Sequence, residues 1–398
     1  MDVLGYLKTY KNLEKFAIVE LSRYLEKYKI INAIDGLIIF SIEKIEDLEK
    51  LAYFSQSAED VGFCLFYNET KKEKQDEEEI KKTILNDLKD NYIISHLQKN
   101  NKIKYKIEIL HSNKIKISEN DYKKKISFLI DIFEKLGFSS DLKSFDFQLS
   151  YFLSETREMI GISIIPEDLS KRSYKIYLLP KSMKGPLGFL MNSIGEILDN
   201  ENKKQKNVLF LFSGDGILPI ELALWKKAMS CRYFDKKKIY QKILQFSNKK
   251  LEEFDEEIKN KFENDKFRIV SCDVELKNLT FGQRNAKLAG IEKEIDFKTI
   301  TIDFLDYKFQ ENEFDAIINY PPLFNQYSSS EKIKKFYKDL FYQTSYLLKP
   351  NCFQVILSRI DQYEIIKEFA EQFKFSIERI PLEIENMEIL KLKNLKKK

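Results

Sequence analysis

Glycine, acidic and amide residues follow four strand-like segments in the second half of the sequence. They lie at residues 213–216, at Asp273, at Asp303 and at residues 319–322. In a sheet of parallel strands, ligands bind at the carboxyl ends of the strands. Glycines there let the backbone approach a ligand, and carboxylates can accept hydrogen bonds from ribose hydroxyls or an adenine amino group. The spacing therefore predicts a site for a nucleoside-containing ligand.

The elements that must position this site alternate between strand and helix from residue 186 onward. Strands are expected at 207–212, 267–272, 295–302, 315–318, 353–358 and 387–392, and helices at 218–227, 279–289, 332–348 and 362–373. Such alternation is typical of an α/β fold with a mostly parallel, doubly wound sheet. A Lys/Glu-rich helical insert is expected to run to about residue 265.

The first half of the sequence has a different pattern. Amphipathic helices are expected at 12–28 and 121–136, a further helix at 42–53, and strand-like segments at 37–40, 61–67, 105–110, 145–152 and 158–165. This order predicts a small α+β module. Residues 71–82 are almost entirely charged and are expected to form a solvated loop or helix face. Residues 166–185, here called the connector, carry prolines and five basic residues.

Composition narrows the possible functions. The net charge is +4 and the two signs are mixed, which argues against a wholly basic nucleic-acid-binding surface. The four cysteines form no CxxC pair, and both histidines lie outside any catalytic context, so we expect no metal site and no histidine-based mechanism. Residues 1–10 lack the apolar core of a signal peptide, and we expect a cytoplasmic location.

Several segments resemble the THUMP-domain RNA guanine-N(2) methyltransferases. VLFLFSGDGILPIELA (208–223) resembles the family's DPFCGSGTIxIEAA, and SCDVELKNLTFGQRNAKLAGI (271–291) resembles GxDID…A…NA…AG. DAIINYPP (315–322) is similar to DxxxxNPPY, EDLSKRSYKIY (167–177) to the LHKRGYR stretch, and KGPLGFLM (184–191) to PLxxxLAAAM. The start, NLEKFAIVELSRYL, resembles GLExxxxEEL. The long insert after residue 227 resembles the bacterial large-subunit rRNA enzymes of this group more than the compact archaeal tRNA enzymes.

The resemblance implies a fold, a domain organisation and a cofactor. We expect a ferredoxin-like subdomain at 1–70, a THUMP-like RNA-binding domain at 71–178 and a Rossmann-like class I methyltransferase domain at 179–398. The implied cofactor is S-adenosyl-L-methionine (SAM), and the implied substrate is an exocyclic amino group of a guanine in rRNA or tRNA. The expected cofactor-binding residues are Phe212, Ser213, Gly214, Asp215, Gly216, Asp273, Val274, Asp303, Phe304 and Asn319.

The sequence departs from the family pattern at its catalytic motif. In register, Tyr320 stands where the family has asparagine, and Leu323 replaces the aromatic residue that stacks on the base. A shift by one residue gives these roles to Asn319 and Phe324 instead. In the family, an asparagine oxygen and a proline carbonyl accept from the amine and orient its lone pair toward the methyl group. The expected catalytic residues are Asn319, Tyr320, Pro321, Pro322 and Phe324.

Substrate contacts are expected in the connector. Phosphate contacts there would position RNA without reading its sequence. Its basic residues are Lys171, Arg172, Lys175, Lys181 and Lys184, with Arg172 favoured because its counterpart lies inside a family motif.

Two other functions stay open. The chain can be an RNA-binding or ribosome-assembly protein that kept the fold and lost the chemistry, which the changes at Phe210, Tyr320 and Leu323 favour. It can also methylate a DNA adenine or a protein glutamine, because such enzymes use a similar motif. The long N-terminal part and the KRSY segment argue against this last possibility.

Overall fold

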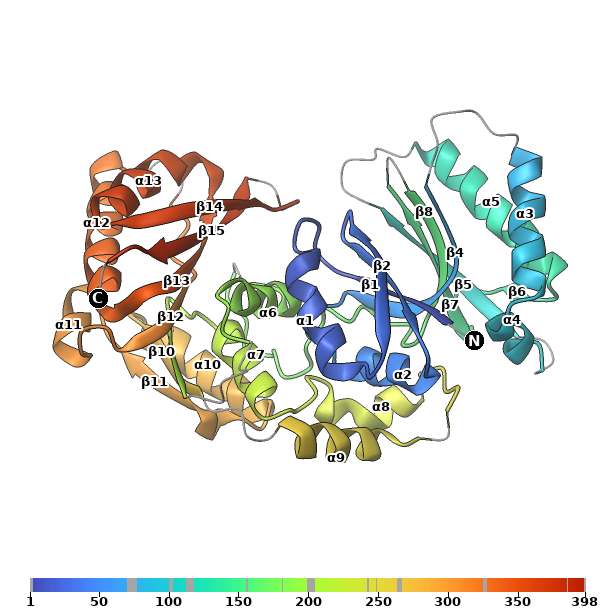
Figure 1. Ribbon diagram of the computed structural model, residues 1–398, viewed down its shortest axis with the longest axis horizontal. Coiled ribbons are helices and arrows are strands. Elements are labelled where there is room, and N and C mark those ends of the chain that lie inside the picture. Colours follow the sequence, from blue (N-terminus) through green and yellow to red (C-terminus); the bar gives the residue numbers. More distant parts are fainter. Residues whose placement is uncertain are drawn as a thin grey trace.

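The chain folds around two β-sheets that lie side by side along its long axis (Figure 1). This computed structural model describes residues 3–69, 77–99, 103–111, 118–154, 157–180, 182–198, 205–241, 243–247, 249–262, 267–324, 328–384 and 386–396. None of the helices in these ranges is long and apolar enough to cross a membrane.

The N-terminal sheet has eight strands in the order β2-β3-β1-β4-β8-β7-β5-β6. The strands are β1 (Val3–Lys8), β2 (Tyr28–Ile34), β3 (Leu37–Ile42), β4 (Asp60–Glu69), β5 (Lys104–His111), β6 (Ser139–Ser140), β7 (Phe147–Leu153) and β8 (Arg157–Ser163). Its helices are α1 (Glu14–Tyr24), α2 (Ile45–Phe54), α3 (Glu77–Lys89), α4 (Tyr92–Leu97) and α5 (Glu119–Lys135). The first six elements follow the βαββαβ order of a ferredoxin-like fold.

Strand β4 joins the two parts expected in the N-terminal half. It pairs with β1 on one side and with β8 on the other, so one sheet runs through both parts. The expected boundary between residues 70 and 71 lies outside the described residues. The expected helix at 12–28 is wrong at its end, because α1 stops at Tyr24 and Tyr28 begins β2.

The C-terminal sheet has seven strands in the order β11-β10-β9-β12-β13-β15-β14. Neighbouring strands from β11 to β13 run parallel, whereas β15 is antiparallel to both β13 and β14. The expected mostly parallel, doubly wound sheet is confirmed. The strands are β9 (Lys206–Leu211), β10 (Phe267–Asp273), β11 (Ile295–Thr299), β12 (Phe314–Asn319), β13 (Leu348–Arg359), β14 (Phe375–Pro381) and β15 (Met387–Asn394).

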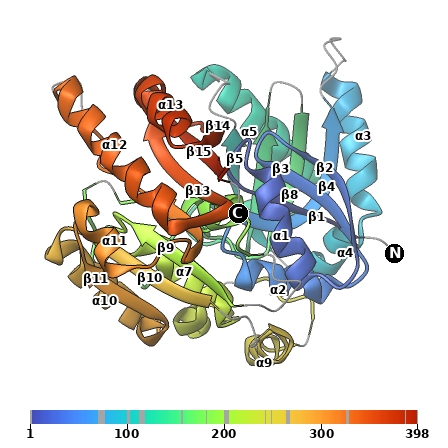
Figure 2. The same cartoon turned by 60° about the vertical axis from the view of Figure 1, so that its left-hand side comes forward.

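Helices cover both faces of this sheet (Figures 1 and 2). One face packs on α6 (Gly185–Ile194), α7 (Ile217–Lys226) and α10 (Leu276–Leu288), and the other on α11 (Leu305–Lys308), α12 (Ser330–Leu347) and α13 (Tyr363–Gln372). Successive side chains of a strand point to opposite faces. Accordingly, Phe210 and Ile318 belong to the core beside α6 and α7, and Leu211 and Ile317 belong to the core beside α12 and α13.

The insert after α7 returns to the N-terminal half and fixes the two halves against each other. It contains η1 (Tyr233–Asp235), α8 (Lys236–Tyr240) and α9 (Leu251–Phe262), which lie beneath α2 in Figure 1. Lys50 of α2 donates to Glu257 of α9 at 2.7 Å, and the Tyr53 hydroxyl donates to Asp255 at 3.2 Å. Contacts between residues that are far apart in the sequence therefore set how the two halves lie against each other.

Candidate functional site

The loop after β9 forms the centre of the candidate site. Phe212, Gly214 and Gly216 have φ angles of +56°, +55° and +84°, so the chain turns sharply before α7 begins at Ile217. A Cβ on Gly216 would lie 2.8 Å from the Cα of Gly282 in α10. Only glycine fits this close approach of two backbones, which brings the loop beside β10.

Asp273 closes this loop onto the next strand end. Its carboxylate accepts from the Gly214 N–H at 3.0 Å, from the Glu275 N–H at 3.0 Å and from the Asn278 amide at 3.1 Å. The side chain is nearly buried, with 4% of its surface exposed. Asp273 therefore holds two of the expected cofactor-binding loops together.

The strand ends beside Asp273 leave exposed apolar surface. Val274 is 41% exposed and Phe304 is 60% exposed, and Asp303 in η3 (Ile302–Phe304) is also exposed. The hollow that separates these strand ends has a volume of about 10 Å³, which is room for about one water molecule. An adenosine group would therefore lie on the open side of these residues rather than inside the hollow.

The motif after β12 divides its side chains between the two faces of the sheet. Tyr320 and Leu323 line a cavity of about 610 Å³ between the C-terminal domain and the N-terminal sheet. The backbone N–H of Tyr320 donates to the Leu211 carbonyl at 3.2 Å. This bond places Tyr320 beside the glycine loop, the loop of residues 212–216 after β9. Pro321 is buried and Pro322 is exposed. Burial, with a smaller effect of the Asp215 carboxylate, raises the pKa of Tyr320, so its hydroxyl is protonated at neutral pH.

Asn319 and Phe324 lie on the other face, away from this cavity. Asn319 has no exposed surface and shares the face of Ile317, and its amide nitrogen and oxygen have no hydrogen-bond partner among the described residues. Phe324 packs against Phe336 of α12, with ring centroids 5.2 Å apart. The structure therefore brings Tyr320 and Leu323 to the cavity and does not bring the alternative pair there.

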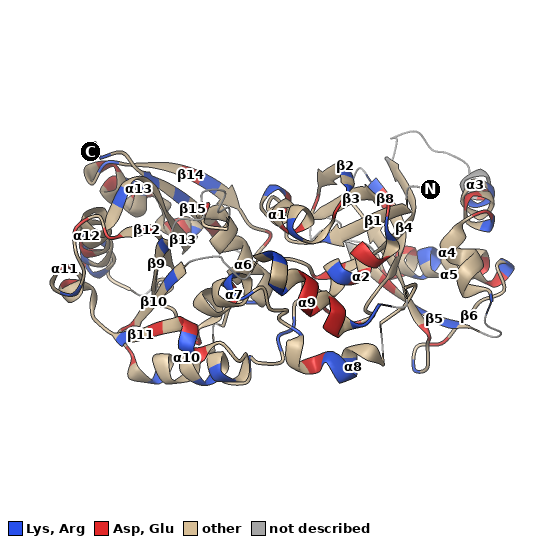
Figure 3. Ribbon diagram, turned by 60° about the horizontal axis from the view of Figure 1, so that its bottom comes forward, with Lys and Arg blue, Asp and Glu red and all other residues tan. Residues whose placement is uncertain are grey.

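A second cavity continues the space toward the N-terminal sheet. It has a volume of about 780 Å³ and shares Lys8, Glu59, Leu110 and Lys184 with the cavity beside Tyr320. Lysine and arginine side chains alternate with acidic ones along its wall, and Figure 3 shows the same mixture of signs over the whole ribbon. Lys171 and Lys184 of the connector line it, whereas Lys181 lies outside the described residues.

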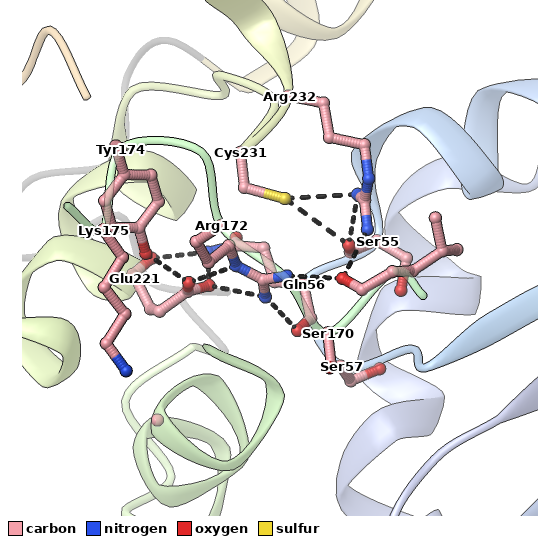
Figure 4. Close-up of polar contacts among 12 residues, drawn as sticks. Ser55, Gln56, Ser57, Ser170, Arg172, Tyr174, Lys175, Glu221, Cys231 and Arg232 are labelled. Carbon is pink, nitrogen blue, oxygen red and sulfur yellow. Dashed lines mark hydrogen bonds and ion pairs between the residues drawn. The ribbon is translucent and has the colours of Figure 1, made fainter. Parts of the chain in front are cut away.

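Arg172 contributes to the wall of this cavity, but its guanidinium is not accessible there as expected. Its side chain has no exposed area, and its Nε donates to Glu221 Oε1 at 2.6 Å (Figure 4). Its Nη atoms donate to the carbonyls of Gln56 at 2.6 Å and Leu169 at 2.7 Å. A guanidinium without exposed surface cannot reach a phosphate. The expected phosphate contact is therefore wrong, and Arg172 instead links the N-terminal domain to α7.

The sequence analysis also missed a cluster around Asp215. The Ser182 hydroxyl donates to its Oδ2, and Lys175 Nζ lies 4.0 Å from the same oxygen. Asn285 donates to its backbone carbonyl at 3.0 Å. The sequence does show that an acidic residue, Asp215, stands where the family has serine. The spacing of the motifs could not show that the connector passes over this loop.

The match to known proteins agrees with SAM as the cofactor. The strand order with one antiparallel strand, the glycine loop and the acidic strand ends define a SAM-dependent methyltransferase domain of class I. Residues 201–387 match the UPF0020 family, the RMKL-like methyltransferase domain. The comparison with curated proteins gave no match.

Solved structures share the architecture of the whole chain. A possible methylase from Clostridium difficile 630 is 18% identical with a TM-score of 0.74, over 100% of this chain and 99% of that chain. TrmN from Thermus thermophilus is 14% identical with a TM-score of 0.64, over 99% and 100%. SMU.472, a putative methyltransferase complexed with SAH, is 14% identical with a TM-score of 0.68, over 100% and 99%. At these identities the likeness shows the fold alone.

Proposed function

We propose that this protein transfers a methyl group from SAM to the exocyclic amino group of a guanine in structured RNA, either rRNA or tRNA. One observation carries the proposal. Tyr320 lines the cavity between the C-terminal domain and the N-terminal sheet, and it stands in register with the family's catalytic asparagine. A substrate held by the N-terminal sheet can therefore reach the end of β12. The choice of guanine and of RNA rests on the resemblance of the sequence segments.

The chain's own residues would bind and orient the amine. An amine conjugated to a base is a weak nucleophile, and acceptors for its two N–H groups turn its lone pair toward the donor. The Tyr320 hydroxyl can accept one hydrogen bond, because a protonated tyrosine oxygen both donates and accepts. The Pro321 carbonyl is the proposed second acceptor. SAM, when bound, supplies the methyl group, and the amine then releases one proton.

The flipped base needs an apolar wall and the rest of the RNA needs positive charge. Leu323, Leu187 and Met387 provide apolar surface in the cavity beside Tyr320. Lys8 and Lys184 line both cavities, and Lys171 lines the outer one. A base extruded from its stack would enter the inner cavity while its neighbours stay outside. The carboxylates on the same walls limit how many phosphates can be neutralised.

The test compares RNA nucleosides from cells with and without the protein by mass spectrometry. A methylguanosine signal that disappears with the gene and returns with the wild-type gene is expected. Tyr320→Phe keeps the ring and removes the acceptor, and we expect it to restore at most about one tenth of the signal, since one lost hydrogen bond at a transition state costs about 1.4 kcal/mol or more. An unchanged profile in the deletion strain would refute the proposed substrate.

The second candidate function is an RNA-binding or ribosome-assembly protein without methyltransferase activity. Two observations favour it: Phe210, where the family has an acidic residue, is fully buried, and the hollow beside Asp273 has a volume of only about 10 Å³. Titration calorimetry with SAM separates the two candidates. Heat that disappears in the Gly214→Ala/Asp273→Ala variant supports the enzyme, and no heat with the wild-type protein supports the second candidate.

A further inference from the structure

Two aromatic rings lie between two cations on the surface of the C-terminal domain. The rings of Tyr177, in the connector, and Phe281, in α10, have centroids 5.7 Å apart. Arg284 Cζ lies 5.1 Å from the centroid of the Tyr177 ring, and Lys277 Nζ lies 5.6 Å from that of the Phe281 ring. Both distances are within the range of cation–π attraction. These four residues, here called the α10 patch, therefore form one continuous row.

The sequence of α10 places three of these residues on one face of the helix. Lys277, Phe281 and Arg284 are four and three residues apart, which is the spacing of neighbours on a helix surface. Both cations are exposed, and both rings are half-buried. α10 contains no aspartate or glutamate, and neither Lys277 nor Arg284 forms an ion pair within the part of the chain that the structure describes. The patch therefore carries two positive charges that this part of the fold does not neutralise.

Backbone hydrogen bonds hold the Tyr177 ring in place. The N–H groups of Ile176 and Tyr177 donate to the Asn285 side chain at 3.2 and 3.0 Å, and the Asn285 amide donates back to the Tyr177 carbonyl at 2.9 Å. The side chains on either side, Ile176 and Leu178, are 64% and 58% exposed. A ring that is fixed before binding loses little freedom when a partner stacks on it. The patch is therefore a preformed, partly apolar platform.

The patch lies next to the candidate site. The Asn285 amide that holds Tyr177 also donates to the Asp215 carbonyl of the glycine loop at 3.0 Å. From Tyr177 the connector continues to Met183, which lines the cavity beside Tyr320. This length of extended chain spans at most about 20 Å. One nucleic-acid strand can therefore reach both the patch and the cavity.

We propose that the α10 patch binds an unpaired segment of the RNA substrate, with a base stacked on the rings and phosphates beside the two cations. The inference rests on the proposed RNA substrate. Proteins that bind single strands combine aromatic rings, on which bases stack, with cations that follow the backbone. A base inside a duplex is already stacked on its neighbours, so the patch selects unpaired nucleotides. The methyltransferase domain thereby holds part of the RNA itself.

The test measures binding of the full chain to a fluorescently labelled single-stranded RNA of about 12 nucleotides by polarisation. Phe281→Leu keeps an apolar side chain and removes the ring, so we expect it to weaken binding about five- to hundredfold, the range for one stacked base, without changing the salt dependence. Lys277→Gln should weaken binding and reduce the slope of log affinity against log salt by about 0.7, the value for one phosphate of a single strand. Lys338→Gln removes an exposed lysine of α12, on the opposite face of the sheet, and as the matched control should bind as the wild type does.

A blunt RNA duplex of the same sequence shows whether the patch selects unpaired bases. It should bind the wild type and Phe281→Leu equally, because its bases offer no free face to the ring. A duplex that loses as much affinity as the single strand would overturn the stacking of a base on the patch. If Phe281→Leu fails to fold, Arg284→Gln, at an exposed position, tests the patch together with Lys277→Gln.

Further outcomes separate this inference from the proposed function. Single-strand binding that is absent in the wild type, or unchanged in both patch variants, overturns the inference and leaves the proposed function standing. If Phe281→Leu instead changes the sedimentation of the protein alone, the patch is an interface between copies of the chain, which also overturns the inference. An unchanged methylguanosine profile in the deletion strain, with RNA binding weakened in both variants, refutes the proposed methylation and supports the RNA-binding patch.

Discussion

Replacing Arg172 by methionine should destabilise the protein strongly, because it leaves a carboxylate buried without its cation. The Glu221 carboxylate has no exposed surface and would keep only neutral donors among those described, Gln56 at 2.7 Å and Tyr174 at 2.6 Å. Removing one partner of a buried ion pair costs about 3–5 kcal/mol. The Gln56 carbonyl loses its donor as well, whereas the Leu169 carbonyl still accepts from Arg232 at 2.8 Å. We therefore expect a loss of about 4 kcal/mol.

Urea unfolding followed by tryptophan fluorescence measures this loss. The chain has a single tryptophan, Trp225, which lies in α7 with Glu221 and is 2% exposed. The double variant Arg172→Met/Glu221→Met removes both charges, so it should be more stable than Arg172→Met alone, because apolar residues of similar volume can replace a buried pair at little cost. Lys123→Met breaks an exposed pair in α5, where the lysine is 70% exposed, and should change stability by less than about 0.5 kcal/mol.

Two results would contradict this reasoning. A loss below about 1 kcal/mol for Arg172→Met would mean that water reaches the Glu221 carboxylate, in contrast to the buried geometry. A double variant no more stable than Arg172→Met would mean that the loss comes from packing rather than from the stranded charge. Either result would also weaken the assignment of Arg172 to the contact between the domains.

Three further predictions follow from single sites. Gly216→Ala should lower stability by about 2–4 kcal/mol in thermal unfolding, because its φ is +84° and a Cβ would lie 2.8 Å from Gly282 Cα; a change below about 1 kcal/mol would contradict this close approach. Lys171→Gln and Lys184→Gln should each weaken RNA binding and reduce the slope of log affinity against log salt by about 1, measured by filter binding; an unchanged slope would remove that lysine from the interface. Cys272 is buried and burial raises its pKa to about 12, so alkylation of the native protein at about pH 8, followed by mass spectrometry, should modify Cys272 far more slowly than the partly exposed Cys352; equal rates would contradict the burial.

The sequence predicted most of the C-terminal sheet and missed its edge. Long alternation of apolar strands and helices indicated a parallel sheet, and the strand order confirmed it. β14 was missed because its sequence, FSIERIP, is charged and mostly exposed, as suits an edge strand. β1 was missed because it is short and contains Gly5, whose missing side chain makes room for the Phe40 ring. The pattern of apolar and polar residues within a segment identifies a strand less well when the strand is stabilised mainly by pairing with other strands.

The sequence by itself determined which residues stand at the strand ends, because the length and polarity of a strand depend on its own residues. Parallel strands then bring their carboxyl ends to one edge of the sheet. Only the tertiary structure decided which way those residues face. A shift of one position exchanges the two sides of a strand, so Tyr320 meets the cavity while Asn319 is buried on the face that it shares with Ile317. Tertiary packing also buried Arg172 and brought Lys175 to Asp215. The connector's path over the loop depends on contacts between residues far apart in the chain, which no local pattern records.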